Sequence, residues 1–321
     1  MLDLKKGEVD LLLMSICIPV YNSEKTIESA VNSILACGRN DIEVVLFYDK
    51  STDATLNIIK GMTDTRIRIV CNTQKMDYGK MLLECGNSCL GKYLMYVIDR
   101  NYISGQMLDE FLDMIEENED IVCGMCSPVR HHTYKIYCDT VDKINALGYQ
   151  AQHITGSFFQ TRLFKQLVPD LKNVDYGNFP LDFLFSLFCL EGKGVLYNEI
   201  YQSDSDYMSV VQCKTKSSTN KATEWFRPLG QMKYLRTAVK HLCQLEISGV
   251  EKKKIFKHLY RRIKVQATWG YKNILVDSRF CGHYNIESKY VGVHQLAFWS
   301  VLIFFHKVYC SVLIAAVRVR F

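Results

Sequence analysis

Apolar runs bounded by turn residues alternate with segments of helical periodicity through the first hundred residues. The apolar runs predict buried strands at 11–20, 43–48, 66–71 and 93–98. Between them, apolar side chains recur three or four residues apart, which predicts helices that begin at Ser23, continue from Leu56 and span residues 80–89. Strands that alternate with helices at this spacing predict an α/β fold with a mainly parallel sheet and flanking helices.

Turn-like, polar segments follow three of the predicted strands, at 19–22, 49–53 and 99–101. In a parallel sheet the carboxyl ends of neighbouring strands meet at one edge, and ligands bind beyond that edge. We therefore expect these three segments to contribute to a single site.

Composition fits a protein of the reducing cytoplasm. The chain has 321 residues, 48% of them hydrophobic, which is enough for one large α/β domain with a C-terminal extension. Several of its 13 cysteines lie in apolar runs, and the single C-x-x-C pair at 123–126 lacks the second pair of a zinc site. The first ten residues lack the basic-then-apolar pattern of a signal peptide. We expect a cytoplasmic location.

Basic residues gather in the C-terminal third, although the net charge of the whole chain is only +5. They lie at 252–254, 257, 261–262 and 264, which indicates either a solvated helix face or a surface for an anionic partner. No nucleic-acid reader motif accompanies them, so we expect no nucleic acid. The apolar stretch 296–317 is interrupted by His306 and Lys307. An interfacial helix, a single membrane span and a buried or oligomeric contact therefore remain open.

This pattern divides the chain into an α/β domain at 1–210 and a helical C-terminal region at 211–321. We expect the second region to associate peripherally with the inner face of the membrane, where anionic lipids attract basic segments.

Four motifs occur in a fixed order along the first 200 residues. They read SICIPVYN at 15–22, VVLFYDKSTDAT at 44–55, GKYLMYVIDRN at 91–101 and LDFLF at 181–185. Together they resemble the inverting GT-A glycosyltransferases of family 2, over residues 14 to about 205. The resemblance implies a GT-A (Rossmann-like) fold, a nucleotide-sugar donor and a setting such as bacterial cell-surface polysaccharide assembly.

The resemblance also implies which residues bind the donor. The first loop would contribute Pro19, Tyr21, Asn22 and Glu24. Asp49 falls where the family has the second Asp of a pair that accepts hydrogen bonds from a uracil-type base, which suits an acceptor-only carboxylate. Tyr48 replaces the first Asp. We expect a UDP-sugar, although a thymine base presents a similar edge; the alternative is that Asp49 and Asp53 only form turns or cap a helix.

The D-x-D motif of the family holds Mn²⁺ or Mg²⁺, which bridges the diphosphate of the donor. Here the segment reads Asp99–Arg100–Asn101. In one register Asp99 and Asn101 are the metal ligands. In the other, Arg100 stands at a ligand position and its guanidinium meets the diphosphate directly. We expect Asp99 to be the main donor ligand and leave the divalent cation open.

For catalysis, the resemblance implies that Asp182 is the general base. It precedes an apolar helix, whose N-terminus favours the ionised carboxylate, and a simple helix cap is the alternative. Leu181 replaces the Glu of the family motif. His153 and Gly156 would line the acceptor side, where glycine lets the backbone approach a sugar, unless they form an ordinary turn.

We therefore predict transfer of a sugar from a nucleoside-diphosphate donor to a glycan or lipid-linked acceptor, with inversion. The alternative is a non-catalytic glycosyltransferase-like subunit or scaffold, because Tyr48, Arg100 and Leu181 replace acidic residues. A nucleotidyltransferase would require a Gly-rich signature with Lys or Arg near the first strand, which residues 19–22 do not provide.

Overall fold

The computed structural model describes residues 12–72, 76–127, 133–149, 154–171, 176, 179–203, 228–261 and 308. The chain forms two compact units. One comprises residues 1–173 and 179–204, and the other residues 174–178 and 205–321. Each unit is described separately.

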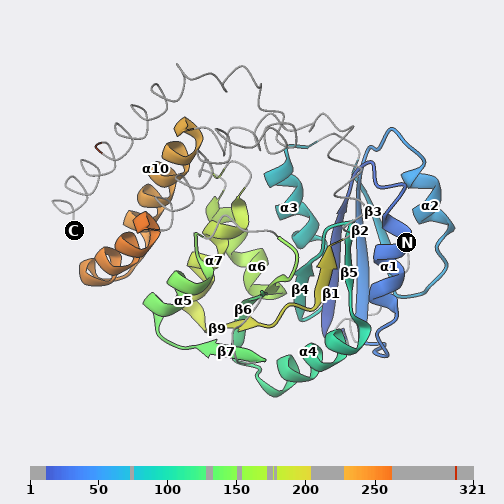
Figure 1. The fold of residues 1–321 in the computed structure, drawn as a ribbon, viewed down its shortest axis with the longest axis horizontal. Coiled ribbons are helices and arrows are strands. Elements are labelled where there is room, and N and C mark those ends of the chain that lie inside the picture. Colours follow the sequence, from blue (N-terminus) through green and yellow to red (C-terminus); the bar gives the residue numbers. More distant parts are fainter. Residues whose placement is uncertain are drawn as a thin grey trace, which may run out of the picture. The chain divides into compact units, whose positions relative to one another are not determined.

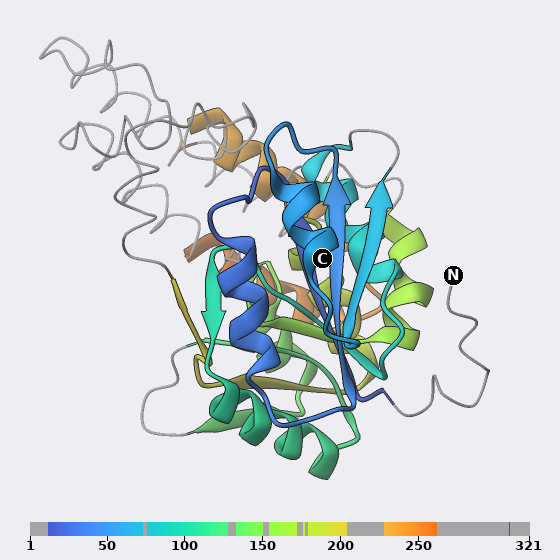
Figure 2. The same ribbon diagram turned by 90° about the vertical axis from the view of Figure 1, so that its right-hand side faces the viewer.

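An eight-stranded mixed sheet forms the centre of the first unit (Figure 1). Its strands, in spatial order, are β3 (Ile67–Asn72), β2 (Ile42–Asp49), β1 (Met14–Val20), β4 (Tyr93–Tyr96), β8 (Ser157–Gln160), β6 (Ile121–Cys126), β9 (Lys193–Tyr197) and β7 (Tyr134–Tyr137). Strands β3, β2, β1 and β4 run parallel, as β6 and β9 do. Figure 2 shows β2 and β3 as neighbouring blue arrows that point the same way. Strand β8 is antiparallel to both β4 and β6, and β7 to β9.

Helices cover both faces of this sheet. They are α1 (Ile27–Leu35), α2 (Thr55–Gly61), α3 (Tyr78–Asn87), α4 (Gly105–Glu117), α5 (Thr140–Leu147), α6 (Thr161–Leu167) and α7 (Pro180–Glu191), with a 3₁₀ turn at Val168–Leu171. A separate two-stranded sheet pairs β5 (Asn101–Ile103) with β10 (Tyr201–Ser203) in antiparallel register.

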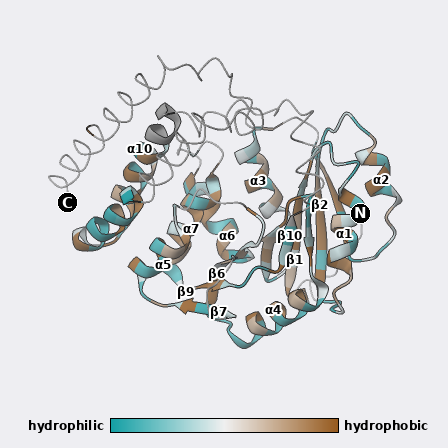
Figure 3. Ribbon diagram, viewed as in Figure 1, coloured by the Kyte–Doolittle hydropathy of each residue, from teal (hydrophilic) through white to brown (hydrophobic). Residues whose placement is uncertain are grey.

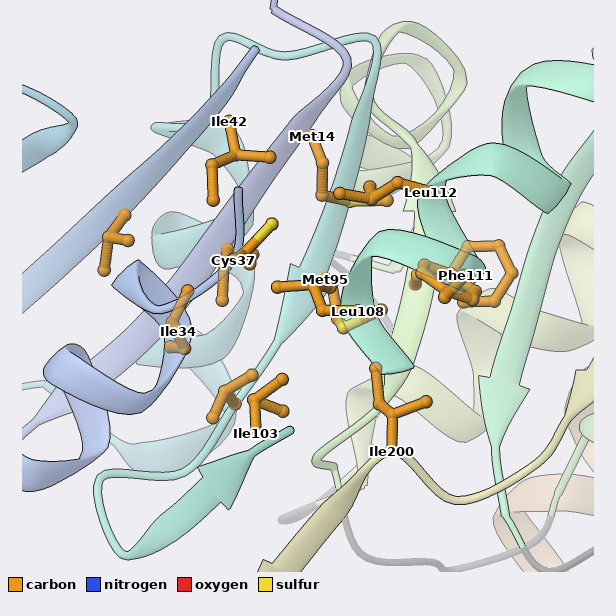
Figure 4. Packing of buried hydrophobic residues seen from close by; sticks show 14 of the residues in the cluster. Met14, Ile34, Cys37, Ile42, Met95, Ile103, Leu108, Phe111, Leu112 and Ile200 are labelled. Carbon is orange, nitrogen blue, oxygen red and sulfur yellow. The ribbon is translucent and has the colours of Figure 1, made fainter. Parts of the chain in front are cut away.

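The main core lies between the sheet and helices α1 and α4. Figure 4 shows Met14 and Met95 from the strands close to Ile34 of α1 and to Leu108 and Leu112 of α4. Because side chains alternate along a strand, the intervening residues of β1 face the other helical layer, where α3 packs on β1. Strands β1 and β2 are thus buried on both faces, which explains their nearly continuous apolar sequence, visible as brown ribbon in Figure 3.

The predicted α/β fold with a mainly parallel sheet is confirmed, and the four predicted strands correspond to β1–β4. Two details differ. The first strand begins at Met14 rather than at residue 11, which lies outside the described residues. An antiparallel strand, β8, stands in the middle of the sheet between β4 and β6, and the sequence did not indicate it.

A buried polar cluster joins the amino-terminal ends of β1, β2 and β3 to the segment before β4. The carboxylate of Glu43, 6% exposed, accepts hydrogen bonds from Ser15 Oγ (2.5 Å) and from Arg68 Nε (2.8 Å). The backbone N–H of Leu90 also donates to Glu43 (2.9 Å). Because Glu43 of β2 thereby contacts β1, β3 and the segment before β4, the cluster helps to set the register of the sheet at the end opposite to the predicted site.

In the second unit, α10 (Pro228–Gln244) is followed by a helical segment at 249–261. Within that segment Ile255, Phe256 and Leu259 are buried. Its exposed residues include Lys253, Lys254, Lys257 and Arg261, which are spaced so that they share one helix face. Within the part of the chain that the structure describes, no helix combines the length and apolar character needed to cross a bilayer. The predicted interfacial stretch at 296–317 lies outside the described residues except for residue 308.

Candidate active site

The loops after β1 and β2 are joined by hydrogen bonds at the carboxyl edge of the sheet. The backbone N–H of Asn22 donates to Ser51 Oγ (2.9 Å), and the side-chain oxygen of Asn22 accepts from the N–H of Thr52 (2.8 Å). Asn22 has φ = 52°, a left-handed conformation that asparagine tolerates better than most residues. Asn22 therefore connects the two loops through its backbone and side chain together.

A second connection between these loops is reciprocal. The Glu24 carboxylate accepts from the N–H of Ala54 (3.0 Å), and the N–H of Glu24 donates to Asp53 Oδ2 (3.2 Å). Asp53 Oδ1 also accepts from the N–H of Thr55 at the start of α2 (3.1 Å). Although partial burial raises the pKa of Asp53, the hydrogen bonds from Thr55 and Glu24 outweigh it and lower that pKa. Glu24 and Asp53 thus shape the rim of the site.

Asp49 is the last residue of β2 and is 4% exposed. Asn72, its partner in the parallel register with β3, donates from Nδ2 to Asp49 Oδ1 (3.1 Å). This amide orients the carboxylate at the edge of the sheet. The neighbouring Tyr48 donates its phenol to the carbonyl of Ser51 (3.4 Å), so the residue that replaces an acid in the family motif supports the same loop.

Residues 98–101 form a tight turn after β4. The N–H of Asn101 donates to the carbonyl of Ile98 (3.0 Å), which makes Asp99 and Arg100 the two central residues. The carboxylate of Asp99 accepts a hydrogen bond from the hydroxyl of Ser23 in the β1–α1 loop. Asp99 is therefore attached to the two joined loops, although it lies 76 residues from Ser23 in sequence.

Electrostatics link three side chains around this turn. Burial raises the pKa of the Asp99 carboxyl, against the opposing influences of the Ser23 hydroxyl and the Arg100 guanidinium. Burial likewise raises the pKa of Tyr78, at the start of α3, to about 12, while the charge of Arg100 lowers it and that of Asp99 raises it. The N-terminus of α3 thus lies close to the Asp99–Arg100 turn.

Thr155 fixes both ends of the same turn. Its hydroxyl accepts from the N–H of Ile98 (3.0 Å) and donates to Asn101 Oδ1 (2.7 Å). Next to it, Gly156 donates its N–H to the carbonyl of Tyr96 (2.8 Å) and has φ = 82°. A side chain on Gly156 would bring a Cβ within 2.7 Å of the Cβ of Cys126, so glycine is required here for backbone conformation and for space.

Asp182 lies on a different element, in the first turn of α7, and is 5% exposed. Pro180 occupies the first position of that helix, which suits its missing N–H and fixed φ. The carbonyl of Asp182 accepts from the N–H of Tyr149 (3.2 Å), which ties α7 to the segment just after α5. The start of a helix favours an ionised carboxylate.

Hydrogen bonds thus connect the segments that carry the predicted residues Asn22, Glu24, Asp99, Asn101 and Gly156. Asp49 ends the neighbouring strand, Pro19 is buried within β1 and Tyr21 follows that strand half-buried. His153 lies outside the described residues. Sequence reasoning missed two residues that organise the turn, Ser23 and Thr155.

The oxygen atoms that this turn offers as ligands test the predicted metal site. Asp99 is the single carboxylate in residues 98–101, and the side-chain oxygen of Asn101, 1% exposed, accepts from Thr155. Throughout the described residues, no three His, Cys, Asp or Glu side chains are grouped so that they could hold a metal ion. The Asp99–Asn101 pair does not fit a divalent cation, which prefers several accessible oxygen ligands.

Comparison with known proteins agrees with this geometry. Residues 15–171 match the family model described as "Glycosyl transferase family 2". An Escherichia coli UDP-Glc:alpha-D-GlcNAc-diphosphoundecaprenol beta-1,3-glucosyltransferase is 33% identical over 94 residues, which cover 28% of this chain and 36% of that protein. Matches to three other curated bacterial glycosyltransferases cover 34%, 33% and 18% of their length, so the chain spans about a third of such relatives or less.

Two solved structures share the fold at low sequence identity. Staphylococcus aureus TarS 1–349 in complex with UDP-GlcNAc is 17% identical, with a TM-score of 0.57 over 86% of this chain and 79% of that chain. A mannosyltransferase from Pyrobaculum calidifontis, in complex with GDP-Man and Mn²⁺, is 11% identical, with a TM-score of 0.53 over 96% and 86%. The fold is that of the GT-A glycosyltransferases, and residues 15–171, just under half of the chain, are similar to glycosyl transferase family 2.

Proposed function

We propose that this chain transfers a sugar from a nucleoside-diphosphate donor, a UDP-sugar, to a glycan or lipid-linked acceptor with inversion at the anomeric carbon. The observation that carries the proposal is the hydrogen-bonded assembly of the β1–α1 loop, the β2–α2 loop and the Asp99 turn at the carboxyl edge of a family 2 sheet. An edge of this kind is where open α/β sheets bind nucleotides.

Recognition of the base is assigned to Asp49. Its ionised carboxylate accepts hydrogen bonds only, so it suits the ring N–H of uracil. The amide of Asn72 holds one carboxylate oxygen at 3.1 Å and thereby orients the group. The complex of TarS with UDP-GlcNAc supports a uracil-containing donor by analogy of fold. The other residues proposed to contact the donor are Pro19, Tyr21, Asn22 and Glu24 of the first loop.

Asp182 is the proposed general base. The acceptor hydroxyl gives its proton to the Asp182 carboxylate while its oxygen bonds to the anomeric carbon of the donor sugar. The bond from that carbon to the diphosphate breaks at the same time, and the nucleoside diphosphate leaves with the electron pair. Because attack and departure occur on opposite faces, the configuration inverts. The acceptor would lie along 153–156, where Gly156 brings the backbone close to the sugar.

A transfer assay tests the proposal. The purified protein is incubated with UDP-, dTDP- and GDP-sugars and with lipid-linked or free glycan acceptors, and the release of nucleoside diphosphate and the anomeric configuration of the product are measured. We expect Asp182→Asn to lower kcat about 10²–10⁴-fold, the range for loss of a general base. Asp170→Asn, at an exposed aspartate on the 3₁₀ turn, is the matched control and should keep wild-type turnover.

The transfer assay also decides between an enzyme and a scaffold. If the wild-type protein binds donors but releases no nucleoside diphosphate with any acceptor, it is a non-catalytic subunit. If Asp182→Asn keeps its turnover while remaining folded, Asp182 is not the base.

The basic face of the 249–261 helix supports peripheral association with the cytoplasmic face of a membrane. Lys253, Lys254, Lys257 and Arg261 are exposed, and each such charge near an anionic surface contributes about 1 kcal/mol of binding. The relative that acts on a diphosphoundecaprenol-linked sugar supports an acceptor held at a membrane, in cell-surface polysaccharide synthesis.

Vesicle sedimentation tests this location. We expect Lys257→Glu to weaken binding to vesicles of phosphatidylglycerol and phosphatidylcholine by about 30-fold, because it reverses one charge in the basic face and so costs about 2 kcal/mol. Lys60→Glu, which changes another exposed lysine, on α2, should have no effect. Equal binding by both variants, or no binding by the wild-type protein, would remove the membrane from the proposal.

A further inference from the structure

The 98–101 turn presents Asp99 and Arg100 at the edge of the sheet. Before the turn, the N–H of Val97 donates to the carbonyl of Cys17 (3.0 Å), which extends the pairing of β4 with β1. Within the turn, Asn101 N–H bonds to Ile98 (3.0 Å), and the Thr155 hydroxyl holds both end residues. The two central residues are therefore the ones that a ligand at this edge meets.

The geometry is unfavourable for chelation by residues 99 and 101. Asn101 is 1% exposed, and its side-chain oxygen accepts from Thr155 at 2.7 Å inside the protein. Asp99 accepts from Ser23, and this bond draws its carboxylate toward the β1–α1 loop. The two side chains that would form one end of a metal site are thus engaged with different parts of the protein.

Arg100 contributes a permanent positive charge at the same place. It is half-buried, and its charge lowers the pKa of both Asp99 and Tyr78, so it lies near the carboxylate and the phenol. A guanidinium is planar and donates two parallel hydrogen bonds to phosphate oxygens. It therefore provides what a divalent cation provides to a diphosphate, namely neutralising charge and fixed geometry.

We propose that Arg100 binds the diphosphate of the donor in place of a divalent cation, so that this protein binds nucleoside diphosphates without metal. The inference rests on the proposed function, because it concerns the same donor site. Asp99 then orients the loops through Ser23, and Arg100 neutralises the charge that develops on the departing diphosphate.

Equilibrium binding of UDP, measured by titration calorimetry, tests the inference. The wild-type protein is titrated once in excess EDTA and once in MnCl₂, and we expect dissociation constants that agree within about twofold. Arg100→Ala should weaken binding about 10–100-fold in both buffers, which corresponds to the 1.5–3 kcal/mol typical of a hydrogen bond to a charged group. Arg39→Ala is the matched control, because Arg39 is a half-buried arginine beside Asp41 at the opposite edge of the sheet.

Arg100→Asp gives a second, independent readout. This change restores an acidic residue beside Asp99, so we expect no binding of UDP in EDTA and partial recovery in MnCl₂. Gain of metal dependence is a result that simple damage to the fold would not produce. Circular dichroism of each variant confirms that the protein is folded before titration.

The outcomes separate the two proposals. Binding of UDP by the wild-type protein in MnCl₂ but not in EDTA would overturn the role of Arg100 and leave the glycosyltransferase intact. Undiminished binding by Arg100→Ala would overturn it as well. Absence of binding to UDP, dTDP and GDP in either buffer would instead overturn the proposed function itself.

Discussion

Replacement of Thr155 by valine tests whether one hydroxyl organises the 98–101 turn. Valine is similar in size but has no polar group. The Ile98 N–H would lose an acceptor at 3.0 Å and Asn101 Oδ1 would lose a donor at 2.7 Å, in a region where Thr155 and Asn101 are each 1% exposed. The substitution therefore removes two hydrogen bonds and gives Asn101 no access to water in exchange.

The magnitude follows from these contacts. Each hydrogen bond contributes about 0.5–1.5 kcal/mol, and a buried group left without its partner costs about 1–3 kcal/mol, so we expect a loss of about 2–4 kcal/mol. For a unit of this size, that loss lowers Tm by about 4–16 °C. The turn should also become less well ordered. UDP should therefore bind more weakly even at 25 °C, where the variant is still folded.

The assay combines thermal unfolding followed by circular dichroism with calorimetric titration of UDP. Thr155→Ser is the matched control, since it keeps the hydroxyl and loses only a methyl group. We expect serine to retain most of the stability and binding. If Thr155→Val unfolds at the wild-type temperature, or if serine and valine lose the same amount, the hydroxyl does not hold the turn and the reasoning fails.

Three further changes have expected outcomes. Gly156→Ala should lower stability by about 1–3 kcal/mol in urea unfolding, because alanine is strained at φ = 82° and its Cβ would lie 2.7 Å from Cys126 Cβ. Glu43→Gln should lower the free energy of unfolding by about 1–3 kcal/mol in the same measurement. This is less than the loss expected for a fully buried ion pair, because the Arg68 side chain is 31% exposed. The lowered pKa of Asp53 means that its ionised form stabilises the fold above the unfolded-state pKa of 3.8, and that this contribution is lost as pH falls through the folded-state pKa. Asp53→Asn should therefore be less stable than wild type at pH 7, with the difference shrinking below pH 3.8; a difference that stays constant with pH would contradict this.

Strands β1, β2 and β4 could be predicted because burial on both faces leaves a nearly continuous apolar sequence in them. Strand β8 could not be predicted in the same way. Of its four residues, Ser157–Gln160, only the two phenylalanines are apolar, so no apolar run marks the strand. Its place between β4 and β6 depends on pairing with residues 93–95 and 123–125, and such long-range contacts leave no local pattern.

Only some residues of the candidate site could be predicted, because the others depend on long-range contacts in the same way. Asp49 and Asp99 could be located because each follows an apolar strand, where polar residues are informative. Ser23 was interpreted as the start of a helix, yet its hydroxyl contacts Asp99 at a separation of 76 residues. Thr155 contacts Asn101 across 54 residues. Which polar side chain supports which loop is a property of the folded sheet, and neither spacing nor residue type reveals it.

These supporting contacts explain how the motif can change its charge without changing its shape. The 98–101 turn is held by the backbone bond from Asn101 to Ile98 and by the Thr155 hydroxyl, and both connections are independent of the side chain at position 100. A carboxylate or a guanidinium can therefore occupy that position on the same backbone. A carboxylate there requires a cation to meet a diphosphate, whereas arginine meets it directly. The choice between these two chemistries rests on one residue, which is why Arg100→Asp should remain folded while its donor binding becomes dependent on metal.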